Sequence, residues 1–120
     1  MNLISVACGG AIGSLGRYTI SLIPIKTEFP LLTLIINIFG AVIIGFISGI
    51  ATENPNLSHN MVLFWKTGLC GGFTTFSAFS LEVFELFEKK SYFYGSLYIL
   101  LSLILCIAGI ILGKKIASVI

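Results

Sequence analysis

The stretch 68-GLCGGFTTFSAFS-80 decides the fold of this chain, because it places weak helix formers inside a long apolar segment. Gly71 and Gly72 together lower helix stability by about 2 kcal/mol relative to alanine. Thr74 and Thr75 add β-branched side chains, which lose rotamer freedom against the preceding turn. We therefore predict a short non-helical stretch here. The alternative is a continuous helix in which the glycines serve packing and the hydroxyls bond back to the preceding turn.

The composition indicates a membrane protein. Of the 120 residues, 57% are hydrophobic and 10% are charged, whereas soluble domains carry about 25% charged residues. So few charges cannot cover a water-soluble surface, and the length leaves room for one domain, 1–120. The net charge of +2 forms no basic stripe with interleaved aromatic residues, which argues against nucleic acid as a partner. Three cysteines without a C-x-x-C pair are interpreted as small buried hydrophobes.

Four windows are long and apolar enough to cross a membrane, which takes about 20 residues for about 30 Å of hydrocarbon. They cover about 3–23, 31–51, 61–87 and 93–113. Backbone groups in lipid must pair internally, so the spans are helices. The expected fold is an all-α membrane protein of four transmembrane helices, the third broken in mid-membrane. We expect a multi-pass protein of the cell membrane.

The loop charges give no orientation. The lysines divide equally between the two sides of a four-span chain: Lys66, Lys114 and Lys115 against Lys26, Lys89 and Lys90. Either the numbers are too small to decide, or copies insert both ways and pair antiparallel. Because four helices enclose no water-lined pathway of their own, we expect an oligomer. Small residues spaced for close helix contact support this packing: Gly9 with Gly13, Ala41 with Gly45 and Gly49, and Gly109 with Gly113.

A break in the third helix would also create ion ligands. Freed carbonyls at membrane depth are tolerated only when they are buried in protein or line a site. Unwound carbonyls are good ligands for a hard cation such as Na⁺, and helix amino ends favour anions. Phe76 and Phe79 share one helical face, and Ser77 and Ser80 form a polar row beside it. Positive ring edges and hydroxyls can hold a small anion, although the spacing of the two phenylalanines by itself favours simple core packing.

Further polar residues lie inside the other spans. Thr33 and Asn37 lie one turn apart in the second span, where the amide either donates to an anion or joins helices. Glu82 is an intramembrane carboxylate and therefore a functional candidate. A polar-to-small stripe follows the fourth helix, and it can line either a pore or a helix contact: Tyr98, Ser102 and Cys106.

Three motifs, in order along the chain, resemble those of the Fluc (CrcB-type) fluoride channels. They are "GGAIGSLGRY" (9–18), "FPLLTLIINIFGAVIIG" (29–45) and "GGFTTFSAFS" (71–80). The third departs from the family at Ala78, where a second threonine-like residue is usual. The resemblance covers the whole chain. It implies a fluoride-selective channel that exports toxic cytoplasmic fluoride by passive electrodiffusion, built as an antiparallel dual-topology homodimer with two pores.

The resemblance also implies roles for particular residues. A structural Na⁺ at the dimer interface would be held by the carbonyls of Gly71 and Thr74 from both subunits. The fluoride pore would be lined by Asn37, Phe76, Phe79, Ser77, Thr75, Tyr98 and Ser102. Arg17, Thr33 and Glu82 would lie near the pore. Cys106 falls where a small hydroxyl residue is expected, which leaves its role open.

Two other functions remain open from the sequence. A proton-coupled transporter of the small multidrug type would use Glu82, the deepest carboxylate. A non-transporting membrane assembly subunit would use the glycines for packing alone. No residue is placed for a covalent step, so we assign no catalytic activity.

Overall fold

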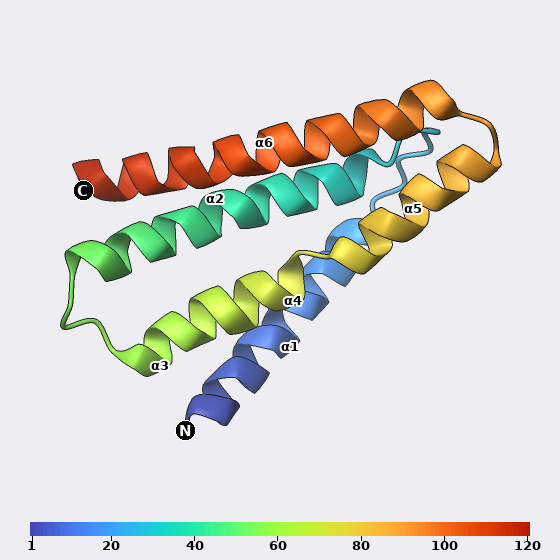
Figure 1. Ribbon diagram of the computed structural model, residues 1–120. Helices are drawn as coiled ribbons and strands as arrows, with labels where there is room; N and C mark the ends of the chain where they lie inside the picture. The colour runs from blue at the N-terminus through green and yellow to red at the C-terminus, as the bar shows by residue number, and fades with distance from the viewer.

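The computed structural model describes residues 1–120, and the chain is all helical, as the sequence predicts (Figure 1). The helical elements follow in the order α1 (Asn2–Ser21), α2 (Leu31–Glu53), α3 (His59–Val62), η1 (Leu63–Cys70), α4 (Gly71–Phe73), α5 (Phe76–Glu88) and α6 (Tyr92–Val119). The element η1 is a π-helix, a rare form that often lies at functional sites. No sequence signal predicted it.

Three helices are long and apolar enough to cross a membrane: α1, α2 and α6, with 20, 23 and 28 residues. At 1.5 Å per residue, α6 is about 42 Å long, more than the hydrocarbon thickness requires. The predicted window 61–87 is instead divided among α3, η1, α4 and α5, none of which spans that thickness alone. The chain is a multi-pass membrane protein.

The helix of this third window is interrupted at two threonines. α4 ends at Phe73 and α5 begins at Phe76, while Thr74 (φ −83°, ψ 160°) and Thr75 (φ −149°, ψ 121°) are extended. The prediction that the glycines belong to the non-helical stretch is wrong, because Gly71 and Gly72 lie within α4. The Thr74 N–H still bonds to the Cys70 carbonyl (2.9 Å), so the helix continues past the glycines.

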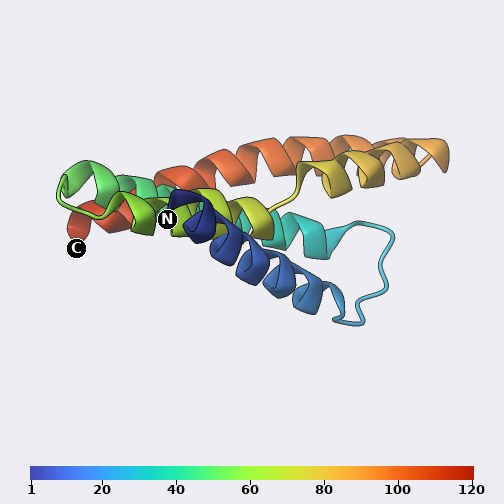
Figure 2. The same ribbon diagram turned by 90° about the horizontal axis from the view of Figure 1, so that it is seen from below.

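The interruption changes which helix the chain packs against. η1 and α4 lie along α1, whereas α5 lies along α6 (Figures 1 and 2). The extended segment crosses between the two groups in both views. The Ser91 hydroxyl, just before α6, donates to the carboxylate of Glu28, just before α2. These two helices therefore begin at the same end of the molecule and run side by side in one direction.

Glycines set the closest helix contacts, as the small-residue spacing predicts. A Cβ on Gly45 of α2 would collide with the carbonyl oxygen of Ile110 in α6, and one on Gly113 would collide with that of Val42. Glycines bring α1 equally close to the backbone of η1: Gly9, Gly13 and Gly68. A larger residue at any of these points forces the two backbones apart.

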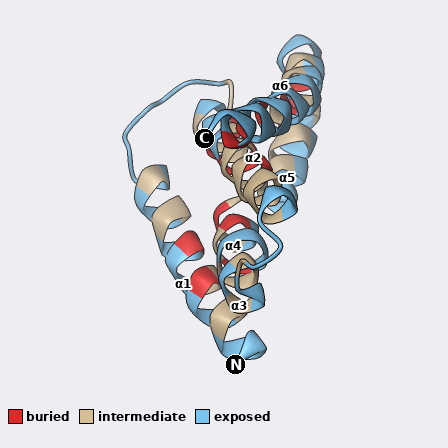
Figure 3. Ribbon diagram, turned by 90° about the vertical axis from the view of Figure 1, so that its left-hand side faces the viewer, coloured by how far each residue is buried: buried red, intermediate tan, exposed pale blue.

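The chain buries little of itself. Only 17 of its 120 residues are buried, and they follow the facing sides of the helices (Figure 3). The exposed surface is 7611 Å², whereas a compact water-soluble chain of this size would expose about 6,300 Å². Large apolar side chains such as Leu3 and Ile111 lie exposed on the outer faces. Such a surface suits contact with lipid and with further protein.

Candidate functional site

A groove of about 350 Å³ lies between α2, the interrupted helix and α6. We call it the central groove. Its walls carry no charged side chain. It brings together seven of the residues predicted for the site: Asn37, Gly71, Thr74, Thr75, Phe76, Phe79 and Ser102.

Asn37 holds the interruption in place from α2. Its Nδ2 donates to the Thr75 carbonyl (3.1 Å), and its Oδ1 accepts the Thr75 N–H (2.9 Å). This amide therefore replaces the helical hydrogen bonds that the extended residue cannot make. Of the two functions that the sequence left open for Asn37, joining helices is the one observed. An amide nitrogen carries two hydrogens, so one N–H remains for another acceptor.

Thr75 in turn starts the next helix. Its Oγ1 accepts the Ala78 N–H at 3.1 Å, which is the hydrogen bond of an N-cap residue. The same oxygen lies 3.4 Å from the Ser77 Oγ. Ser77 itself is exposed and does not line the central groove.

The carbonyl oxygens around the interruption fall into two groups. The Gly72 oxygen accepts a hydrogen bond from the Arg17 Nε (3.3 Å), and the Thr75 oxygen accepts that of Asn37. The oxygens of Gly71 and Thr74 accept none. Unpaired main-chain oxygens are the ligand type that hard cations take, so these two residues fit the predicted cation site.

Aromatic rings continue from the central groove along α5. The rings of Phe76 and Phe79 have centroids 5.6 Å apart at an interplanar angle of 42°. Phe79 also meets the ring of Tyr98 edge-on, at 5.0 Å and 63°. Phe76 is 78% exposed, whereas Phe79 is half-buried. The exposed ring is therefore free to meet a ligand or a second chain.

A half-buried carboxylate lies at the far end of this aromatic row. Glu82 Oε2 accepts a hydrogen bond from Thr33 Oγ1, and Oε1 accepts one from the Tyr98 hydroxyl, both at 2.9 Å. Tyr98 is fully buried. The three side chains come from α2, α5 and α6, so Glu82 joins all three helices.

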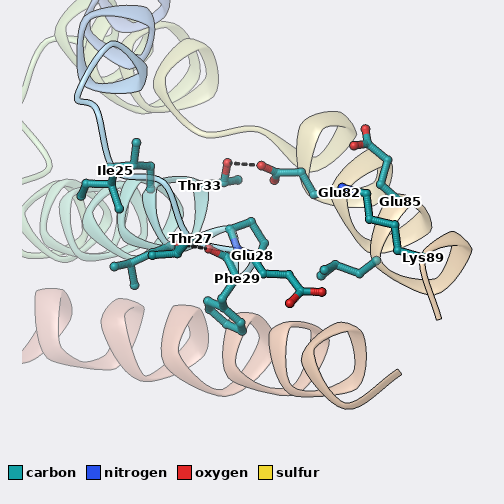
Figure 4. A pocket seen from close by; sticks show the side chains of 12 residues that line it. Ile25, Thr27, Glu28, Phe29, Thr33, Glu82, Glu85 and Lys89 are labelled. Atoms are coloured by element: carbon teal, nitrogen blue, oxygen red, sulfur yellow. Dashed lines mark hydrogen bonds between the residues drawn. The ribbon is translucent and has the colours of Figure 1, made fainter. Parts of the chain in front are cut away.

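Glu82 also borders a second, more polar pocket of about 270 Å³, at the end of the molecule where α2 begins (Figure 4). Figure 4 shows the Thr33–Glu82 hydrogen bond at its upper edge, with Glu28, Glu85 and Lys89 around the opening. The predicted site residues therefore lie in two groups. One lines the central groove, and the other is the Glu82 cluster of Thr33, Glu82 and Tyr98. The Phe79–Tyr98 contact connects them.

Cys70 and Gly40 are among the groove residues that had no predicted role at the site. Cys70 reaches the central groove from η1, although its apolar context indicated only packing. Gly40 of α2 makes room for the interruption, because a Cβ there would collide with the Thr74 methyl group. Gly40 matches the second-helix motif of the family that the sequence resembles, but that match does not say what the glycine faces.

Apolar helices, an interrupted segment and an uncharged, mostly apolar groove define a multi-pass helical membrane protein. The family of this membrane protein follows from its sequence: residues 4–114 match the model of the CrcB-like protein family (Camphor Resistance, CrcB). The chain belongs to this family, which confirms the resemblance seen in its motifs.

Relatives named "Fluoride-specific ion channel FluC" match the chain over nearly all of its length. The one from Azobacteroides pseudotrichonymphae is 41% identical and the alignment covers 90% of this chain and 89% of the relative. That from Ruminiclostridium cellulolyticum is 40% identical, covering 100% and 95%. That from Roseiflexus sp. is 43% identical, covering 99% and 98%.

Proposed function

We propose that this protein is a fluoride-selective channel that lets cytoplasmic fluoride leave the cell by passive electrodiffusion. The family and the names of its relatives support this function. The observation that carries it in this chain is the central groove, which offers ring edges and neutral hydrogen-bond donors and no charged side chain.

The donors suit a small, strongly hydrated anion. Replacing the water around fluoride takes several hydrogen bonds, and binding must stay weak enough for the ion to leave. Asn37 has one N–H to spare, and the buried Ser102 hydroxyl has no protein partner. Positive ring edges of Phe76 and Phe79 complete an anion site without a fixed charge. Thr75 and Tyr98 belong to the same pathway, with Ser77 at its exposed side.

We propose that α3, η1, α4 and α5 together form the third of four spans, broken at Thr74. The working unit is a homodimer of antiparallel, oppositely inserted copies. The open surface of the single chain supports an oligomer. The equal division of the lysines supports insertion both ways. A second copy would close the central groove into a pathway.

We also propose a structural Na⁺ at the dimer axis, with the carbonyl oxygens of Gly71 and Thr74 of both copies as its ligands. Two oxygens from each chain make four, and Na⁺ accepts oxygen ligands of this kind. The bound ion would neutralise carbonyl charge that the interruption leaves unpaired. Arg17 keeps the neighbouring Gly72 oxygen occupied.

The test is ion efflux from liposomes that contain the purified protein. A fluoride electrode should record rapid fluoride release when a potassium ionophore balances the charge, and a chloride electrode should record none under the same conditions. Retention of fluoride would contradict the proposal and favour an assembly subunit. Release that stops when a pH gradient is removed would favour the proton-coupled transporter.

A further inference from the structure

Two of the three cysteines line the central groove. Cys70 contributes from η1 and Cys106 from α6, whereas Cys8 lies exposed on α1, outside the groove. Cys70 is only 1% exposed, so its thiol is covered by protein. Cys106 is half-buried and therefore is the thiol that a solute in the groove can reach.

One helical turn before Cys106 stands a hydroxyl without a partner. Ser102 is 8% exposed, and its Oγ is buried with no hydrogen bond. Other hydroxyls on the helices bond back to the carbonyl four residues earlier, as Thr19 does to Leu15 and Ser80 to Phe76. A buried hydroxyl without a partner is unfavourable. The missing hydrogen-bond partner of the Ser102 oxygen therefore indicates that the groove takes a ligand.

The two side chains are neighbours in space. Residues four apart share one face of a helix, with Cβ atoms about 5–6 Å apart. Ser102 and Cys106 both line the central groove, so this face is the one that the groove exposes. A sulfur and an oxygen donor thus lie side by side along the groove, the oxygen covered until the Ser102 side chain rotates toward an occupant.

We propose that Cys106 and Ser102 form a binding site for a soft monovalent metal ion, with Ag⁺ as the probe. Thiolates select soft cations, whereas oxygen donors alone select hard ones. In the binding step the Cys106 S–H bond breaks, an S–Ag bond forms and the proton passes to water. No atom changes its oxidation state. The Ser102 oxygen contributes a lone pair as the second donor.

The consequence for ion passage rests on the proposed channel function. Silver bound at Cys106 would narrow the central groove, and the Cys106 thiolate would cancel the charge of Ag⁺, so the site would stay neutral. The added bulk would obstruct the path of fluoride. We therefore expect silver to inhibit fluoride efflux.

The experiment uses the full chain in liposomes, in chloride-free buffer, because silver chloride is insoluble and silver fluoride is soluble. Added Ag⁺ should slow fluoride efflux of the wild type by about tenfold or more. The variant Cys106→Ser should lose most of that inhibition when each protein is compared with its own rate before silver. The matched control Cys8→Ser should keep it. Equal inhibition of Cys106→Ser and wild type would overturn the proposal.

Metal counting tests the site without relying on ion flux. In native mass spectrometry, Cys8→Ser/Cys70→Ser should bind one Ag⁺ per chain, and the same protein with Cys106→Ser added should bind none. Adding Ser102→Ala to the double variant should weaken silver binding by about fivefold, equivalent to about 1 kcal/mol. Absence of silver from the double variant would refute the site. Absence of fluoride efflux before silver would instead refute the proposed function.

Discussion

The amide of Asn37 and the main chain of Thr75 are joined by two hydrogen bonds, of 3.1 Å and 2.9 Å, across 38 residues of sequence. The pair resembles the hydrogen bonding between two strands, with a side chain in the place of one strand. It gives the extended residue both a donor and an acceptor. The interruption is therefore a fixed part of the structure that α2 supports.

Replacing Asn37 by aspartate should destabilise the protein and reduce fluoride efflux. The carboxylate keeps an oxygen for the Thr75 N–H but loses the N–H donor to the Thr75 carbonyl. Leaving such a group unpaired costs about 1–3 kcal/mol. Thermal unfolding in detergent and the efflux rate measure the two effects. The control Asn56→Asp, in an exposed loop, should change neither.

Replacing Thr75 by valine should destabilise the start of α5. Valine has nearly the same shape but cannot accept the Ala78 N–H, so the helix loses its N-cap, at a cost of about 1 kcal/mol. Thr75→Ser keeps the acceptor and should keep most of the stability. A lower unfolding midpoint for serine than for valine would contradict the assigned cap.

Substituting Gly113 by alanine should push α2 and α6 apart. The new Cβ would collide with the Val42 carbonyl, and overpacking of this kind costs about 1–3 kcal/mol. Gly10→Ala is the matched control, because its Cβ would meet only an ordinary contact at 3.8 Å. Unfolding midpoints of the two variants in the same detergent decide between them. Equal midpoints would mean that the α2–α6 contact is looser than described.

Phe76→Ile should lower fluoride efflux with little loss of stability. Its ring is 78% exposed, so little packing is removed, whereas the positive ring edge is lost. We expect a decrease of about tenfold or more in rate. Phe84→Ile, on the same helix and also exposed, serves as the control and should keep the wild-type rate. If both variants lose efflux equally, the effect belongs to α5 as a whole.

Glu82→Gln distinguishes a channel from a proton-coupled transporter. Coupling through this carboxylate would be abolished by the amide, together with transport. In a channel the efflux changes in rate but persists without a pH gradient.

Tyr98→Phe removes the hydroxyl that donates to Glu82 and should cost about 1–3 kcal/mol of stability. Glu85→Gln, exposed one turn further, is the control for both measurements.

The sequence predicted those features of the fold that depend on neighbouring residues alone, namely the apolar spans and the faces of single helices. The apolar windows correspond to α1, α2 and α6 because length and hydrophobicity specify a span whatever it packs against. The i, i+3 spacing correctly put Phe76 and Phe79 on one face. Of the weak helix formers in this region, Thr74 and Thr75 are the extended residues, as predicted, whereas Gly71 and Gly72 are helical.

The exact position of the interruption depends on partners far along the chain. Arg17 binds the Gly72 carbonyl across 55 residues, and the Asn37 amide lies 38 residues before Thr75. No local propensity encodes these pairs, so the free main-chain oxygens of Gly71 and Thr74 were indicated only by the resemblance to the family. The same is true of Glu82, whose two donors come from other helices.

The two hydrogen bonds between Asn37 and Thr75 also bear on speed. The interruption is hydrogen-bonded on both its donor and its acceptor side, which holds this segment in one conformation. Loop and domain motions take microseconds to milliseconds, and a passage that needs none of them is free of that delay. The rate of ion passage would then be limited by how quickly the ion loses and regains its hydration water, and the protein would act as a rigid pore.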